Sequence, residues 1–158
     1  MLSAALIPAM TAVEVTSAGL NVGGAATLAA LTEACEATEA KFAGSHEART
    51  ATAIRNMLRW FASRQIRAVA TLAGNVATAS PISDMNPMLL AVGATLTLAS
   101  AAGGLREVPM SGFFLAYRKV DMKPDEVIAN IFIPHTVGSA PSPSPSPSPA
   151  PRQPHQPH

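Results

Sequence analysis

The stretch IRAVATLAGNVATASPISD, residues 66–84, consists almost entirely of small or apolar side chains and hydroxyls. After Arg67 it has no large polar side chain until Asn75. Glycine at position 74 lets backbone N–H groups come close to an anion, the hydroxyls can add hydrogen bonds, and the carboxylate of Asp84 can hold a sugar hydroxyl. These are the parts of a nucleotide-binding segment. The same pattern also fits an ordinary turn beside a helix cap.

Upstream of this stretch the sequence predicts two strands and two helices. Residues 5–23 mix β-branched residues with proline and glycine, which favours short strands joined by a turn near 17–21. Apolar residues at helical spacing then predict a helix over about 28–42, capped by Thr27, and a second one over about 47–64.

Downstream, the pattern favours a short helix and a β-hairpin. Ser83 or Asp84 can cap a helix over about 85–92. Residues 94–100 alternate with period two, 101–104 offer a turn, and 105–109 can return as the second strand. A helical turn at 113–114 and a strand over about 126–133, ended by Pro134, follow. The fold class predicted for the body is α+β.

Composition excludes several functional classes. The 158 residues are 48% hydrophobic and carry a formal net charge of +1, with no basic stripe of the kind that nucleic-acid binders and anionic-membrane binders need. The longest uncharged stretches, 1–13 and 15–32, contain proline, glycine or polar residues. They therefore do not fit the pattern of a membrane-spanning helix. We therefore expect neither nucleic acid nor membrane as a partner.

A single cysteine, Cys35, excludes an intramolecular disulfide and a cysteine-ligated metal cluster within this chain. Its helical spacing from Leu28 and Leu31 predicts a small core residue. Residues 137–158 are mostly Pro-Ser repeats, which predicts a disordered or loosely polyproline II tail. Such a tail is either a linker or truncation scar, or a proline-rich ligand for an aromatic groove.

Four longer motifs occur in the chain: LRWFASRQIR (58–67), GNVATASPISDMNP (74–87), GFFLAYRK (112–119) and EVIANIFIP (126–134). In this order and spacing they closely resemble the FAD-binding domain of the xanthine dehydrogenase family, over about residues 7–135. The related aldehyde oxidases look similar, but they typically carry histidine after the glycine and lack the string TASPISD. Asn75 followed by residues 78–84 therefore favours xanthine dehydrogenase over an aldehyde-oxidase-like flavin domain.

The resemblance implies part of a PCMH-type FAD-binding domain, of the vanillyl-alcohol-oxidase-like fold, over residues 1–136, with a central FAD subdomain over about 47–136. In that family a purine is oxidised at a molybdopterin centre, electrons cross iron-sulfur clusters to FAD, and the flavin reduces NAD or oxygen. The family is homodimeric and works in the cytoplasm or, alternatively, in peroxisomes. Only the flavin step is expected of this chain.

Residues of the FAD site carry over motif by motif. The resemblance implies that a loop formed by Thr71, Leu72, Ala73, Gly74 and Asn75 lies against the FAD diphosphate. Asp84 would make a polar contact with FAD, Thr78 would belong to the same site, and Phe61 and Ile128 would contact the rings of the cofactor. The sequence departs from the family at Ala73, which replaces the first of two glycines. A methyl group then stands where a positive φ or a close backbone approach is expected.

The family's first FAD subdomain is expected before residue 1, and the rest of the flavin domain after residue 136. Its iron-sulfur and molybdenum domains are not in the sequence, so we expect the isolated chain to be inactive. A second hypothesis is a non-catalytic protein-interaction module. Single residues also leave alternatives open: Trp60 fits a core aromatic, Arg59 a flavin contact or a solvated helix face, and Tyr117, Arg118 and Lys119 a dinucleotide contact or a surface turn.

Overall fold

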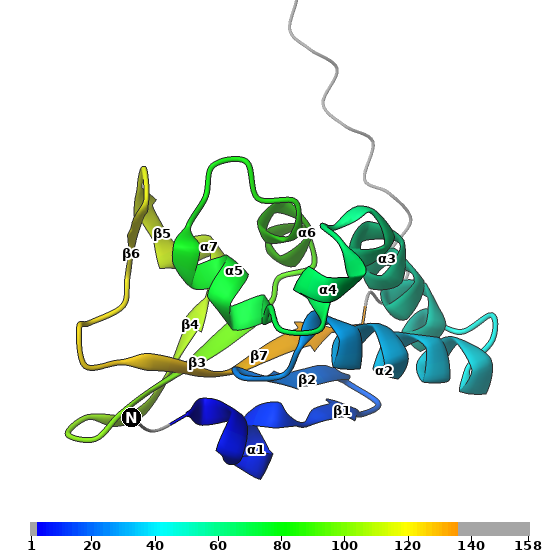
Figure 1. Cartoon of the computed structure of the whole chain (residues 1–158), viewed down its shortest axis with the longest axis horizontal. Coiled ribbons are helices and arrows are strands. Elements are labelled where there is room, and N and C mark those ends of the chain that lie inside the picture. The colour runs from blue at the N-terminus through cyan, green and yellow to red at the C-terminus, as the bar shows by residue number, and fades with distance from the viewer. Residues whose placement is uncertain (1–2, 136–158) are drawn as a thin grey trace, which may run out of the picture.

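The computed structural model describes residues 3–135, in which helices cover one face of an antiparallel sheet (Figure 1). The helices are the 3-10 helix η1 (Ala4–Leu6), α1 (Pro8–Thr11), α2 (Leu28–Lys41), α3 (His46–Trp60), α4 (Arg64–Arg67), α5 (Leu72–Thr78), α6 (Met85–Ala91) and α7 (Met110–Phe113). The strands are β1 (Val13–Val15), β2 (Gly19–Gly23), β3 (Thr95–Ser100), β4 (Gly104–Pro109), β5 (Phe114–Ala116), β6 (Lys119–Val120) and β7 (Val127–Pro134).

Five strands form the main sheet in the order β1-β2-β7-β3-β4, with every neighbouring pair antiparallel. Strand β7, the last in the sequence, lies in the centre of this sheet. It pairs on one side with β2, from Gly19 opposite Pro134 to Gly23 opposite Asn130, and on the other side with β3. The short hairpin of β5 and β6 forms a separate sheet.

Strand β7 carries a bulge near its start. Thr97 of β3 faces Asn130, but the next residue, Leu98, faces Ile128, so Ala129 has no partner on β3. On the other side of β7, the carbonyl of Ala129 accepts a hydrogen bond from the N–H of Gly24 at 2.8 Å. Bulges of this kind bend the strand and redirect its side chains.

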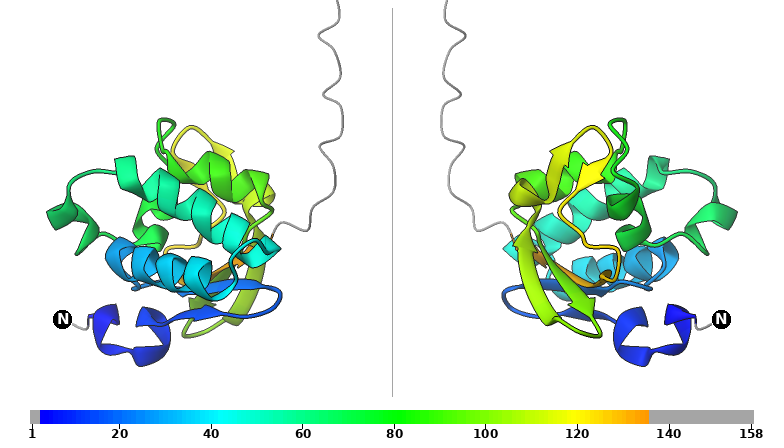
Figure 2. Two further views of the ribbon diagram at one scale, coloured as in Figure 1. Left: turned by 90° about the vertical axis from the view of Figure 1, so that its right-hand side faces the viewer. Right: turned by 90° about the vertical axis from the view of Figure 1, so that its left-hand side faces the viewer.

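The core lies between the sheet and the layer of helices α2 to α7, whereas η1 and α1 lie against the opposite face of the sheet (Figure 2). Leu20, Leu96, Leu98, Ile131 and Ile133 come from the sheet and are fully buried. Helical residues face them: Leu28, Leu31, Ile54, Leu58, Leu72, Met85, Leu89 and Phe113. Burial of this apolar surface is the main contribution to the stability of such a fold.

Cys35 is fully buried in this core, which confirms the expectation from its spacing. Burial, with a smaller contribution from the nearby charge of Glu39, raises the pKa of its thiol to about 12. The thiol is therefore uncharged at neutral pH and behaves as a small apolar side chain.

Most of the predicted elements are confirmed. Thr27 caps α2 by accepting the N–H of Ala30 at 3.1 Å, and the hairpin of β3 and β4 turns where expected. The prediction of strands within residues 5–23 is wrong as far as Thr11, because Ala4–Leu6 and Pro8–Thr11 are helical; Pro8 occupies the first turn of α1, where its fixed φ and missing N–H cost nothing. The predicted tail, 137–158, lies outside the described residues.

Helix α3 ends at Trp60, four residues before the predicted end: Phe61 is extended, and Ala62 then adopts a left-handed conformation with φ of 46°. This conformation costs an alanine roughly 1–2 kcal/mol, because its Cβ approaches the following carbonyl oxygen. The backbone then restarts as α4, with the hydroxyl of Ser63 accepting the N–H of Ile66.

We expect Ala62→Gly to raise the free energy of unfolding by about 0.5–1 kcal/mol, because glycine adopts a positive φ without that cost. Ala62 is exposed, so no packing is lost. The matched control is Ala53→Gly at an exposed position inside α3, where the same change lowers stability by about 1 kcal/mol. Urea unfolding of both variants measures whether each change raises or lowers the free energy of unfolding. An Ala62→Gly variant that is less stable than the unaltered chain would contradict the expected gain.

Candidate functional site

A cavity of about 320 Å³ opens beside the first turns of α5, and we call it the α5 cavity. Its wall on α5 is made of small side chains. The opposite walls come from the N-terminal segment and from the chain entering β7. The lining residues are Ala4, Met10, Gly24, Thr71, Ala73, Gly74, Ala77, Met122, Glu126, Val127 and Ile128. Segments distant in the sequence thus meet at one site.

Helix α5 begins at this cavity because Thr71 caps it. The side-chain oxygen of Thr71 accepts the N–H of Gly74 at 3.0 Å, and its carbonyl accepts the N–H of Asn75 at 3.1 Å. Thr71 also pairs with Thr27, the cap of α2, through an isolated β-bridge. The two helices therefore start side by side, and α5 projects its first turn over the cavity.

This geometry corrects two expectations for the same segment. Residues 71–75 are not a loop, since Leu72 to Asn75 already belong to the first turn of α5. Ala73 does not stand at a position that needs a positive φ, because it is helical. Its side chain is 7% exposed and lines the cavity. Leu72 is buried in the core, so only its backbone is available to a ligand.

Of the predicted site residues, Thr71, Ala73, Gly74 and Ile128 lie around the α5 cavity, whereas Leu72, Asn75, Thr78, Asp84 and Phe61 are not among the residues that line it. Ile128 is 6% exposed and reaches the cavity from the bulged start of β7.

Asn75 and Thr78 are engaged in hydrogen bonds within the chain. The side-chain oxygen of Asn75 accepts a hydrogen bond from the hydroxyl of Ser83 at 2.8 Å, which ties the loop before α6 to α5. The hydroxyl of Thr78 donates to the carbonyl of Gly74 at 2.7 Å. Asp84 is exposed, and Ser83 rather than Asp84 accepts the N–H of Asn86 at the start of α6.

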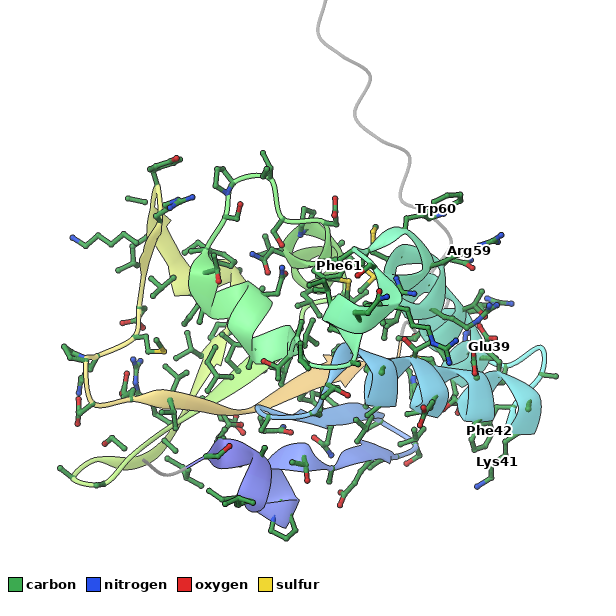
Figure 3. All side chains as sticks on the ribbon, viewed as in Figure 1. Glu39, Lys41, Phe42, Arg59, Trp60 and Phe61 are labelled. Carbon is green, nitrogen blue, oxygen red and sulfur yellow. The ribbon has the colours of Figure 1, made fainter. Side chains whose placement is uncertain are left out.

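The aromatic residues at the end of α3 point in different directions (Figure 3). Phe61 is half-buried and packs against the core, beyond the last turn of α3. Trp60 is 81% exposed, so its interpretation as a core aromatic is wrong. The guanidinium of Arg59 lies 5.4 Å from the centre of the Trp60 ring, which is the arrangement of a cation–π contact on a solvated helix end.

A second cavity, of about 230 Å³, lies between the start of α6 and the hairpin of β5 and β6. Tyr117 and Arg118 line it from the hairpin, and Tyr117 is 76% exposed. Asn86 also lines this cavity, and its side-chain oxygen is buried without a hydrogen-bond partner among the described residues. Both interpretations of residues 117–119 stay open.

An ion-pair cluster stands at the edge of the α5 cavity, and the sequence did not reveal it. The guanidinium of Arg106, on β4, donates to both carboxylate oxygens of Glu126, at 2.7 and 2.8 Å, and to the carboxylate of Asp121 at 3.0 Å. The hydrogen bonds from Arg106 and from the N–H of Lys123 lower the pKa of Glu126 to about 2. Glu126 is therefore charged at neutral pH, although its residue is only 8% exposed.

Within residues 3–135, histidine, cysteine and carboxylate side chains form no group of three or more that could hold a metal ion. In the same part of the chain, none of the helices combines the length and the hydropathy that a membrane span requires.

Comparison with known proteins identifies the family. Residues 1–136 match the family model of the FAD binding domain in molybdopterin dehydrogenase. Over 136 residues the chain is 39% identical to xanthine dehydrogenase of Oryza sativa subsp. japonica and 43% identical to xanthine dehydrogenase/oxidase of Gallus gallus. In both cases the match covers 86% of this chain and 10% of the relative, so the chain spans about a tenth of the length of these curated relatives.

Solved structures show the same fold. Quinoline 2-oxidoreductase from Pseudomonas putida 86 superposes with a TM-score of 0.67 at 23% identity, over 81% of this chain and 41% of that one. The Cu,Mo-CO dehydrogenase gives a TM-score of 0.68 at 23% identity, over 83% and 42%. The predicted α+β fold and the predicted resemblance are thereby confirmed: the chain belongs to the family of FAD-binding domains of molybdopterin dehydrogenases, close to those of xanthine dehydrogenase.

Proposed function

We propose that the α5 cavity holds part of FAD, and that the chain serves the flavin step of a xanthine-dehydrogenase-like oxidoreductase. Such a step would carry electrons from iron-sulfur clusters to NAD or oxygen during oxidation of hypoxanthine or xanthine. The observation that carries the proposal is the meeting of Thr71, Ala73, Gly74 and Ile128 around one cavity, in a chain of an FAD-binding family. When bound, FAD supplies the isoalloxazine ring that accepts and releases the electrons.

The residues at the cavity fit such a cofactor. Ala73, Gly74 and Ala77 have the smallest side chains, so they leave the backbone of the first turns of α5 accessible to a diphosphate. Glu126 lines the cavity, but Arg106 neutralises its carboxylate, which therefore opposes a phosphate group less than a free carboxylate would. Met122 and Ile128 provide the apolar wall that a flavin ring requires.

The remaining predicted residues would contact FAD only beyond this cavity. A volume of about 320 Å³ is at the lower end of ligand pockets, which run from about 300 to 1,000 Å³. It accommodates part of a dinucleotide, and the rest of FAD would extend past the cavity. Asn75, Thr78, Asp84 and Phe61 stay proposed contacts of that outer part.

For the 158 residues alone we expect flavin binding without purine turnover, because the purine is oxidised in this family at a molybdenum centre and not at the flavin. Titration of the purified chain with FAD and with riboflavin, followed by quenching of flavin fluorescence, tests the binding. We expect FAD to bind more tightly than riboflavin, which has no diphosphate. A chain that binds neither flavin would contradict the proposed function, and steady oxidation of xanthine by the chain alone would contradict its inactivity.

Gly74→Glu is expected to lower the affinity for FAD by about tenfold or more, because it places a negative charge where the diphosphate is proposed to lie. The affinity for riboflavin should stay unchanged. The fold should not suffer: Thr71 followed three residues later by glutamate is a capping box, and a carboxylate is favourable in the first turn of a helix. The new Cβ would lie 3.0 Å from the Thr71 hydroxyl, a contact that a shift of a few tenths of an ångström relieves.

The matched control is Gly74→Gln, which has the same shape and the same capping geometry without the charge. Its loss of FAD affinity should be clearly smaller than that of Gly74→Glu. Equal losses for both variants, or an equal loss of riboflavin binding, would place the diphosphate elsewhere.

A further inference from the structure

The chain between β6 and β7 forms one wall of the α5 cavity. In Figure 1 it is the gold segment that descends from β6 into β7. Met122, Glu126, Val127 and Ile128 line the cavity from this side. Residues 121–126 belong to no helix or strand, so no sheet ladder holds them in place. Their position has to come from other contacts.

Arg106 supplies those contacts from β4, with β3 between it and β7. Its guanidinium binds the segment at both ends. At one end it donates to the carboxylate of Asp121 at 3.0 Å and to the carbonyl of Asp121 at 2.8 Å. At the other end it binds both oxygens of Glu126 in a bidentate pair. One side chain thereby fixes the distance between the two ends of the segment.

Glu126 ties the middle of the segment as well. Its Oε2 atom accepts the N–H of Lys123 at 2.7 Å, and its own N–H donates to the carbonyl of Lys123 at 3.1 Å. The turn between these residues is closed from both sides. A second backbone bond, from the N–H of Asp121 to the carbonyl of Phe113 at 2.8 Å, anchors the start of the segment to α7.

Sheet register aims the cluster at the cavity. Arg106 pairs with Leu98 on β3, and Leu98 pairs with Ile128 on β7, so these three side chains stand in one row on the same face of the sheet. The bulge at Ala129 sets where this row meets β7. Glu126 stands just before β7 and lines the same cavity as Ile128.

Stability alone does not call for this arrangement. The side chain of Glu126 is 5% exposed, and placing a carboxylate there costs desolvation energy that an ion pair only repays when its geometry is good. When apolar side chains of similar volume replace a buried ion pair, the protein is often as stable as before or more stable. The cluster differs from an apolar filling because its directional hydrogen bonds allow one conformation of the segment.

We propose that Arg106, Glu126 and Asp121 are positioning residues of the flavin site: they hold the 121–128 wall so that Met122 and Ile128 present a fixed apolar surface to the ring system of the cofactor. This inference rests on the proposed function. It adds that the fit of the flavin ring depends on three charged side chains that do not themselves need to touch it.

The test uses Glu126→Gln in the full 158-residue chain. The matched control is Glu39→Gln, which breaks the pair between Glu39 and Arg55 at 2.8 Å, joining α2 to α3 at the far end of the molecule from β6 (Figure 3). Each variant is first melted and then titrated with FAD and riboflavin at a temperature where it is folded. The visible circular dichroism of the bound flavin reports how the ring is held.

We expect Glu126→Gln to lower the affinity for FAD and the affinity for riboflavin alike, by roughly tenfold, and to change the visible circular dichroism of the bound flavin. Tenfold is the lower limit for the loss of metal affinity when a group that supports a metal ligand is removed. Glu39→Gln should lower the melting temperature without changing either readout. This pattern differs from Gly74→Glu, which should affect FAD alone. If Glu126→Gln fails to fold, Asp121→Asn carries the same test, because the Asp121 side chain is 47% exposed and the loss of its charge is better tolerated.

The outcomes separate the two proposals. If the unaltered chain binds neither flavin, the proposed function fails, and the positioning role fails with it. If the unaltered chain binds both flavins and the folded variants Glu126→Gln or Asp121→Asn keep their affinity and dichroism, only the positioning role is overturned. If Glu39→Gln alters both readouts to the same extent, the effect is one of general stability, and the positioning role is again overturned.

Discussion

Gly24→Ala should lower the free energy of unfolding by about 3 kcal/mol or more, or prevent folding altogether. A Cβ at this position would lie 1.9 Å from the carbonyl oxygen of Ile128 and 3.0 Å from its carbonyl carbon. Both are backbone atoms of the central strand, and the N–H of Gly24 is bonded to the next carbonyl, that of Ala129. No side-chain rotation can relieve the overlap, so β7 itself would have to move.

Thermal unfolding followed by far-ultraviolet circular dichroism measures this effect. The matched control is Gly112→Ala, where the new Cβ would make only an ordinary contact, 3.9 Å from the Pro109 ring, at a position without positive φ. We expect the free energy of unfolding of that variant to lie within about 0.5 kcal/mol of the value for the unaltered chain. A Gly24→Ala chain with an unchanged melting temperature would show that the two strands are not packed this closely.

Gly24→Ala should also abolish flavin binding, because Gly24 and Ile128 line the same cavity. The loss should exceed that caused by any single substitution in the ion-pair cluster. A partly folded variant that retains full riboflavin affinity would argue against a flavin at this cavity.

Phe113→Ala is the second change with a large expected effect, a loss of about 3–5 kcal/mol of unfolding free energy. Phe113 is fully buried and stacks edge-to-face on Phe114, with ring centres 5.3 Å apart. Truncation leaves a large void that the sheet and α7 can only partly fill. Such a loss is a major fraction of the 5–15 kcal/mol that stabilises an ordinary domain.

Urea unfolding compares this variant with Leu115→Ala, two residues along the same chain but 58% exposed. Leu115→Ala should change the free energy of unfolding by no more than about 0.5 kcal/mol. A loss of less than about 1 kcal/mol for Phe113→Ala would mean that the core around α7 rearranges easily, contrary to the close packing of protein interiors.

The sequence predicted those elements whose signals are local. A threonine cap followed by apolar residues at helical spacing defined α2, and strict alternation defined the hairpin of β3 and β4. The early end of α3 could not be predicted, because neither Phe61 nor Ala62 is a residue that marks the end of a helix or a positive φ in the sequence. The prediction of strands within residues 5–23 failed as far as Thr11, because the composition favours strands whereas Pro8 begins a helix.

For the candidate site, the sequence identified residues but not their arrangement. Thr71, Ala73 and Gly74 are neighbours in the chain, and Ile128 was expected in a strand over about 126–133, so their meeting at one cavity needed only the correct sheet order. The pair of Arg106 and Glu126 was missed, because the two residues are 20 positions apart and meet only across β3. Gly24 was missed as well, since its role depends on the bulge in β7.

The central position of β7 has a consequence for folding during synthesis on the ribosome. A nascent chain that has reached Ser100 already contains β2 and β3, but these strands are not neighbours and need residues 127–134 between them. Until that segment has left the ribosomal tunnel, α2 and α3 have only half a sheet to cover, and their apolar faces stay exposed to chaperones. Synthesis of β7 is therefore the event that allows the sheet to close, and pairings as distant as Gly19 with Pro134 make that closure slow.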